Sequence, residues 1–217
     1  MPNHMDHLRR PPLLVLAIWA ALALAFVFAL AEGRIALAVV AVATFVVSLL
    51  PILFASRFGL RLPTSFFAGI VLFSFATIFL GEAFDFYDRF WWWDVVLHSG
   101  AAMGFGLVGV LFMLMLFEGD RYAAPPWAIA FFAFCFAMTI GVLWELLEFV
   151  MDRNFGLNMQ KSGLIDTMWD LVVDACGAML GAGAGFFYLK GGPLGILSRP
   201  IADFVGANRR FFRKERK

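Results

Sequence analysis

The chain has 217 residues, of which 62% are hydrophobic and only 15% are charged, and its formal net charge is +1. An ordinary soluble domain is about half apolar and about a quarter charged, so this composition excludes a soluble globular enzyme, a disordered tail and a nucleic-acid-binding domain. The sequence therefore predicts an integral membrane protein. Its small net charge is the sum of the charges on two faces, which lie on opposite sides of the membrane.

Six apolar segments follow one another, and each is long enough to cross about 30 Å of hydrocarbon, which takes roughly 20 helical residues. We expect helices, because a spanning backbone must satisfy its own hydrogen bonds and no β-barrel alternation is visible. The predicted fold class is all-α, a polytopic six-helix transmembrane bundle forming a single domain over residues 1–190, with a basic cytoplasmic tail over residues 191–217. The helices are expected near Pro12–Ala31, Ile35–Ala55, Thr64–Gly81, Trp93–Phe117, Pro125–Met151 and Asp166–Lys190.

Lys and Arg are divided unevenly between the two ends of these helices. The end that includes the N-terminus carries 13 of the 17 basic residues, and the opposite end carries Arg34, Arg89, Arg153 and Lys161. The positive-inside rule therefore predicts that both termini are cytoplasmic, in a multi-pass protein of the bacterial inner membrane. The first helix also imitates a signal peptide, but its apolar stretch of about 19 residues exceeds the usual h-region of about 7–15, so we expect no cleavage.

The acidic residues have the opposite distribution, with 11 of the 16 at the end that faces away from the cytoplasm. Residues three or four apart share one face of a helix, so the acids form stripes on the last three helices. The stripes consist of Asp94 with His98, then Glu145, Glu148 and Asp152, then Asp166, Asp170 and Asp174. All three stripes are expected at the same depth, in the outer third of the bilayer.

These acids are too costly to face lipid. One Asp at the centre of a spanning helix costs on the order of 2.5–3.5 kcal/mol, so several should face one another in the bundle or in an open cavity. Clustered carboxylates repel one another unless a cation or protons neutralise them. No Lys or Arg of the last three helices lies at this depth, so the sequence predicts protons, a metal ion or a cationic ligand among them.

Carboxylates with a single imidazole suit Mg, Mn, Fe or Zn better than copper. Six residues are the predicted ligands of a divalent metal ion: Asp94, His98, Glu145, Glu148, Asp170 and Asp174. His98 and Glu145 are also the candidates for catalytic proton transfer. The structural alternatives are that a lone Asp hydrogen-bonds a neighbouring helix, that Asp166 is a helix N-cap, and that Asp152 is a solvated helix end.

Small residues recur every four positions in the last helix, at Gly177, Gly181 and Gly185. This spacing lets another helix approach closely, and Gly100 and Gly104 repeat it in the fourth helix. We favour packing of these two helices within one chain, and a homo-oligomer formed through the glycines of the last helix is the alternative.

The segment Asn208–Lys217 carries six basic residues around Phe211 and Phe212. On the cytoplasmic face, such a segment attracts anionic lipid by about 1 kcal/mol per charge, and a signal for topology alone is the alternative. The predicted partners are therefore membrane lipid in general and anionic lipid at this tail, with no nucleic acid.

Five motifs occur in order: Asp94-Val-Val-Leu-His98, Trp144-Glu145-Leu-Leu-Glu148, Asn158-Met159-Gln160, Asp166-Thr167-Met168-Trp169-Asp170 and Gly177-Ala178. Over roughly Tyr87–Gly185 this series resembles the YjdF-like family of bacterial inner-membrane proteins, which has no settled biochemical function. It is more distantly similar to the VanZ-like membrane proteins, which are associated with glycopeptide-antibiotic resistance. The resemblance adds Gln160 and Thr167, which with Asp166 are predicted to contact the substrate or to support the ligands. It implies no reaction.

Three functions fit these residues. The favoured one is a metal-dependent site that acts on or binds a lipid or lipid-linked headgroup, as an intramembrane hydrolase or transferase. The second is a transporter of a cation or cationic drug that uses the acids as a proton or ion relay. It requires polar residues on the cytoplasmic side, where the last three helices offer little beyond Thr139. The third is a non-catalytic membrane assembly partner.

Overall fold

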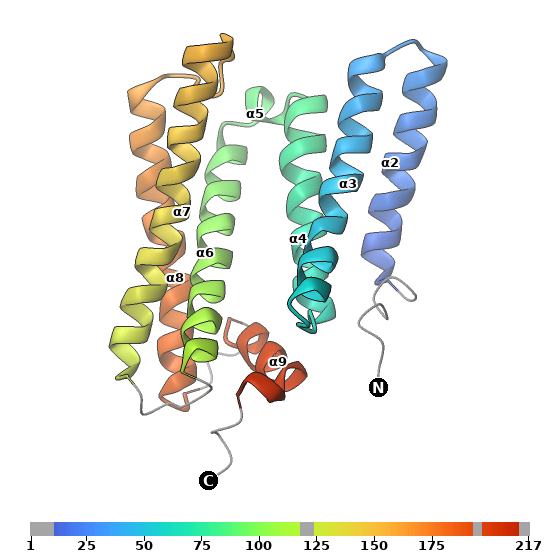
Figure 1. Cartoon of the computed structure of the whole chain (residues 1–217). Helices are drawn as coiled ribbons and strands as arrows, with labels where there is room; N and C mark the ends of the chain where they lie inside the picture. The colour runs from blue at the N-terminus through green and yellow to red at the C-terminus, as the bar shows by residue number, and fades with distance from the viewer. Residues whose placement is uncertain (1–10, 118–123, 193–196, 213–217) are drawn as a thin grey trace. The chain divides into compact units, whose positions relative to one another are not determined.

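The computed structural model describes residues 11–117, 124–192 and 197–212, and these residues form helices and connecting turns without a strand. Six helical segments are long and apolar enough to cross a membrane (Figure 1). They are α2 (Leu13–Ala31), α3 (Ile35–Arg57), α4 with η1 (Thr64–Glu82), α6 (Trp91–Leu116), α7 (Pro126–Phe155) and α8 (Leu164–Leu189). The predicted all-α fold with six membrane-spanning helices is confirmed.

Large apolar side chains are exposed on all six segments. They include Leu24, Phe54, Leu72, Phe112, Phe131 and Leu180, which are between 46% and 71% exposed. A soluble monomer rarely exposes continuous apolar surface of this extent, so these side chains suit contact with lipid. The orientation of the helices stays a prediction, because Arg9, Arg10, Arg121 and residues 213–217, on which it rests in part, lie outside the described residues.

The chain divides into two compact units, residues 1–94 and 95–217, which are described separately. The division falls in the first turn of α6, so this helix is described whole with the second unit. The prediction of a single transmembrane domain over residues 1–190 stays a prediction.

In the first unit, α2, α3 and the third span bury a common apolar core. The core includes Val15, Ile18, Leu22, Ala41, Phe67, Val71 and Phe79. A tight turn joins α2 to α3, in which Gly33 has a φ of 69° and the Arg34 N–H donates to the Ala29 carbonyl at 2.8 Å. Glycine adopts this left-handed conformation without the steric penalty of a Cβ.

The third span changes from an α-helix, α4 (Thr64–Ser74), to a π-helix, η1 (Phe75–Glu82). The sequence predicts an uninterrupted helix here, ending near Gly81. In the structure Gly81 lies against the ring of Tyr87, close enough that a Cβ would overlap the ring. The short helix α5 (Phe86–Arg89) follows Asp85, whose φ is 55°. An apolar stretch predicts that a helix spans the bilayer, but it does not predict whether its hydrogen bonds are those of an α-helix or a π-helix. The π-helix was therefore not predictable.

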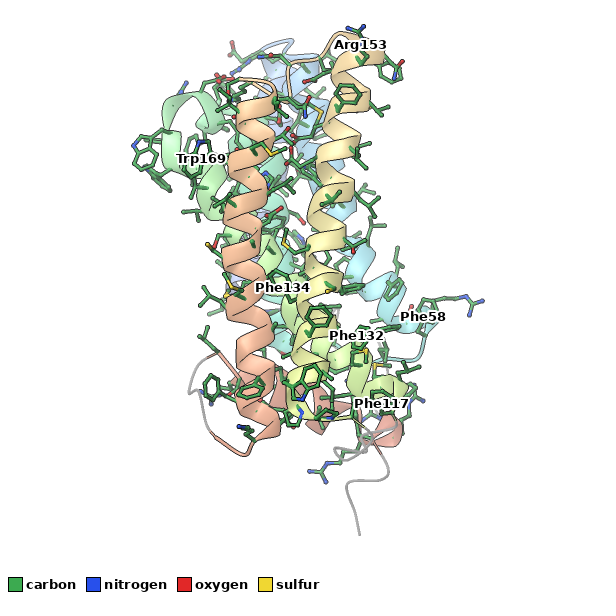
Figure 2. The ribbon with its side chains drawn as sticks, turned by 90° about the vertical axis from the view of Figure 1, so that its left-hand side faces the viewer. Phe58, Phe117, Phe132, Phe134, Arg153 and Trp169 are labelled. Carbon is green, nitrogen blue, oxygen red and sulfur yellow. The ribbon has the colours of Figure 1, made fainter. Side chains whose placement is uncertain are left out.

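In the second unit, α6, α7 and α8 lie side by side, with α7 antiparallel to the other two (Figure 1). Figure 2 shows α7 and α8 along their length, with Arg153 and Trp169 toward one end and Phe132 toward the other. Helix α7 runs four residues past its predicted end, to Phe155, and Gly156 closes it with a φ of 67°. Helix α8 begins earlier than predicted, at Leu164, with Gly163 as its N-cap. The interpretation of Asp166 as the N-cap is therefore wrong, and Asp166 lies in the first turn, where a negative charge still stabilises the helix end.

Small residues bring the backbones of α6 and α8 into contact. A Cβ on Gly177 would overlap the Ser99 carbonyl oxygen, and one on Gly181 would overlap the Met103 carbonyl oxygen. Gly185 packs against the side chain of Val110, which is also on α6. These three glycines therefore contact α6 of their own chain, as small-residue spacing in membrane helices favours.

Beyond α8, the predicted basic tail contains the helix α9 (Arg199–Ala207) and a 3₁₀ turn, η2 (Arg209–Phe211). The helix lies near the end of the three-helix group at which α6 and α8 terminate (Figure 1). One side of it is buried through Ile201, Phe204 and Val205. The exposed side chains include those of Arg199, Arg209 and Arg210.

Candidate metal centre

Two membrane helices bring Asp94, His98 and Asp170 together. Each of the three offers one ligand atom, and these atoms lie within 4.8 Å of one another. We call these residues the Asp–His–Asp group. Asp94 and His98 are half-buried and one turn apart at the start of α6, whereas Asp170, in the second turn of α8, is only 6% exposed. Two carboxylates and one imidazole form a ligand set for a divalent cation.

The register of the three helices explains this meeting. Ala102, Ala137 and Ala178 pack together as an apolar layer between α6, α7 and α8. One helical turn farther toward the start of α6 comes the layer of His98, Gly141 and Asp174. Side-chain contacts support this second layer, since His98 Nδ1 lies 3.3 Å from Asp174 Oδ1 and a Cβ on Gly141 would overlap Asp174 Oδ2.

One turn farther along the same faces lie Asp94, Glu145 and Asp170. Residues four apart on a helix lie one above the other, so Glu145 follows Gly141 on the face of α7 that contacts α8. Its side chain is 4% exposed. The buried Glu145 therefore lies at the level of the Asp–His–Asp group, on the third helix.

The remaining predicted site residues have contacts outside the Asp–His–Asp group. Glu148 is half-buried, and its Oε1 accepts a hydrogen bond from Trp144 Nε1 at 2.8 Å. Ser162 Oγ lies 3.4 Å from Asp166 Oδ1. Gln160 Nε2 donates to Thr167 Oγ1 at 2.6 Å, which ties the loop before α8 to that helix. Their roles as ligands or substrate contacts, and the predicted roles of Glu145 and Asp174 as ligands, stay predictions.

The structure gives Asp152 a role that the sequence did not indicate. Its two carboxylate oxygens accept the backbone N–H groups of Met159 at 2.7 Å and Gln160 at 2.8 Å. Bonds from N–H groups to an ionised acceptor contribute about 1.5–3 kcal/mol each. Asp152 therefore anchors the α7–α8 loop at the end of the bundle nearest the Asp–His–Asp group.

We expect Asp152→Ala to free this loop. The amide protons of Met159 and Gln160 lose their acceptors, so their hydrogen exchange should accelerate by roughly 10–100-fold. Exchange measured by mass spectrometry on peptides that cover residues 156–163 checks this result. Arg153→Ala, at an exposed neighbouring position, is the control and should leave the rate unchanged. Equal protection in both variants would contradict the anchoring role.

Fold and site together define a polytopic helical membrane protein with an Asp–His–Asp group on α6 and α8. The chain belongs to the family described as "Predicted membrane protein (DUF2238)", whose model matches residues 12–191. An uncharacterized protein of Thermotoga maritima is 31% identical over 98 residues, which are 45% of this chain and 50% of that protein. The chain thus spans about half the length of this relative. No solved structure matches.

Proposed function

We propose that Asp94, His98 and Asp170 bind a divalent metal ion, and that the protein binds or acts on a lipid or lipid-linked headgroup at the outer face of the membrane. The observation that carries this proposal is the convergence of three ligand atoms within 4.8 Å from two apolar helices. Two carboxylates would balance the charge of a divalent cation. Acids inside membrane segments are costly and commonly mark functional sites.

The donor set determines which chemistry the site could support. Carboxylate oxygens with one imidazole nitrogen suit Mg, Mn, Fe or Zn, and such an ion polarises a phosphoryl or acyl oxygen. Glu145 comes from a third helix at the same level and is buried. A carboxylate there could accept a proton from an attacking water. The protein's own contribution would be to orient the headgroup and to move that proton.

A headgroup is the favoured substrate because the group is close to the helix ends. Asp94 is in the first turn of α6 and Asp170 in the second turn of α8, within roughly 10 Å of each helix start at 1.5 Å per residue. The exposed Trp91 and Trp169 occur in the same turns, and Trp prefers the boundary between membrane and water. The scarcity of Lys and Arg at this end, where only 4 of the 17 lie, supports its assignment to the outer face.

The alternative function, a transporter that uses the acids as a proton or ion relay, is less well supported. A relay requires polar side chains to continue toward the other face. The layer beyond His98 and Asp174 consists instead of Ala102, Ala137 and Ala178, which are at most 3% exposed. The hydroxyl of Thr139 donates to the Cys135 carbonyl of its own helix at 2.8 Å. These contacts favour a site that opens to one side over a path through the described parts of α6, α7 and α8.

A binding measurement tests the proposal. The protein is placed in nanodiscs of phosphatidylcholine, and spin-labelled phosphatidic acid of short chain length is the probe. We expect saturable binding with Mn²⁺, at least about tenfold weaker with EDTA or in Asp170→Asn, and unchanged in Asp203→Asn, which alters an exposed acid of α9. Binding that is indifferent to both Mn²⁺ and Asp170 would contradict the headgroup proposal. Mn²⁺ flux into proteoliposomes would favour transport instead.

A further inference from the structure

A buried carboxylate pairs with the one imidazole of the Asp–His–Asp group. Asp174 Oδ1 lies 3.3 Å from His98 Nδ1, and the two side chains are only 4% and 11% exposed. An ionised carboxylate can only accept a hydrogen bond, so an ionised Asp174 at this distance favours the form of His98 in which Nδ1 carries the proton. In the neutral Nδ1–H tautomer the lone pair is on Nε2, and this nitrogen can act as a metal ligand.

The second oxygen of Asp174 has an unusual neighbour. Oδ2 is buried, and it has no hydrogen-bond partner among the described residues. It lies against Gly141 of α7, so closely that a Cβ on Gly141 would overlap it. Glycine in a helix interior costs about 1 kcal/mol relative to alanine. The space that Gly141 leaves is what admits the Asp174 carboxylate between α7 and α8.

We propose that Asp174 is a positioning residue and that the missing side chain of Gly141 provides the space for its carboxylate. Asp174 holds His98 in the tautomer with the proton on Nδ1, so that Nε2 is directed to the ion, and Asp174 itself is not a ligand. A histidine that binds a metal commonly donates its other N–H to a carboxylate, which fixes the ring and raises its basicity. The inference rests on the proposed function for the identity of the ligand, a divalent cation.

The tautomer of His98 can be observed directly because the chain has only three histidines. In a His4→Ala/His7→Ala background, His98 is the only imidazole, and ¹⁵N-labelled histidine distinguishes a protonated Nδ1 from a protonated Nε2 by NMR. We expect the proton on Nδ1 without metal. With Zn²⁺ as the probe, we expect the Nε2 resonance to shift while Nδ1 stays protonated. A proton on Nε2 in the metal-free protein would overturn the proposal.

Two variants separate positioning from a general structural role. Asp174→Asn should reduce the Nδ1–H population and weaken Zn²⁺ binding by roughly 10–100-fold, the usual effect of losing such a partner. Gly141→Ala should weaken binding similarly by displacing Asp174, and the double variant should lose little more, because both changes act on one pair. Gly183→Ala, where a Cβ meets nothing within 4 Å, is the control for Gly141→Ala.

The outcomes distinguish the two proposals. Unchanged Zn²⁺ affinity and an unchanged tautomer in Asp174→Asn would overturn the positioning role and leave the metal site standing. An Nδ1 proton that depends on Asp174, in a protein that binds no Zn²⁺, would support the positioning role and contradict the proposed metal function. The tautomer of the unaltered His98–Asp174 pair decides the matter even if a variant fails to fold.

Discussion

Gly181→Ala is expected to destabilise the protein strongly, whereas Gly183→Ala is expected to be neutral or stabilising. A Cβ on Gly181 would overlap the Met103 carbonyl oxygen and lie 3.1 Å from the Cα of Gly106. Both neighbours are backbone atoms of α6, which cannot rotate away. Overpacking of this kind costs about 1–3 kcal/mol or more. The same methyl on Gly183 meets nothing within 4 Å, and alanine favours the helix by about 1 kcal/mol over glycine.

Thermal unfolding in detergent, followed by circular dichroism, measures this difference. The melting temperature of Gly181→Ala should fall by several degrees relative to Gly183→Ala, and Gly177→Ala should behave like Gly181→Ala because its Cβ would overlap the Ser99 carbonyl oxygen. Equal melting temperatures would contradict the close approach of α6 and α8. If Gly181→Ala instead separated a dimer without destabilising the monomer, the glycines would lie between chains.

Loss of one ligand of the Asp–His–Asp group is expected to abolish tight ion binding. His98→Ala and Asp170→Ala each remove one of the three ligand atoms that converge within 4.8 Å. Removing an outer partner of a metal ligand usually costs 10–100-fold in affinity, so removing a ligand should raise the Kd for Mn²⁺ by at least about 100-fold. An ion at 100 times its Kd stabilises the folded state by about 2.7 kcal/mol, so Mn²⁺ should raise the melting temperature of the unaltered protein but not that of the two ligand variants.

Calorimetric titration with Mn²⁺ and with Zn²⁺ checks this prediction. Asp203→Asn, at an exposed acid of α9, is the control for loss of charge and should bind like the unaltered protein. Glu148→Gln tests the wider ligand set that the sequence predicts, and a large loss of affinity there would extend the site beyond the Asp–His–Asp group. Equal affinity of His98→Ala and the unaltered protein would contradict the site.

The sequence was most informative where one physical requirement decides the structure. An apolar stretch of about 20 residues without charges has few alternatives to a spanning helix, and the six spans follow. Spacing on one helix was similarly readable, because residues four apart share a face. The pair Asp94 and His98 could therefore be placed together, and the cost of acids in lipid indicated that Asp170 should face them.

What could not be predicted depends on the register between helices. Nothing in the order of residues indicates that Asp174 faces Gly141, because this requires the vertical offset of α7 and α8. The sequence offered one indication that Gly141 is special: it is a glycine in mid-helix, four residues before the acid Glu145. The loop contacts of Asp152 depend on where the backbone N–H groups of Met159 and Gln160 point. The buried side of α9 was not predicted, because the arginines on either side of this segment made it resemble a solvated basic tail.

The central claim is that one divalent ion is held by the imidazole of His98 and by carboxylates of α6 and α8. The most direct measurement is the X-ray absorption spectrum of the Mn²⁺-loaded protein in the His4→Ala/His7→Ala background, together with the metal-to-protein ratio. We expect one ion per chain, with one imidazole nitrogen among oxygen ligands. A protein that retains no ion, or an ion whose ligands include no imidazole, would contradict the claim.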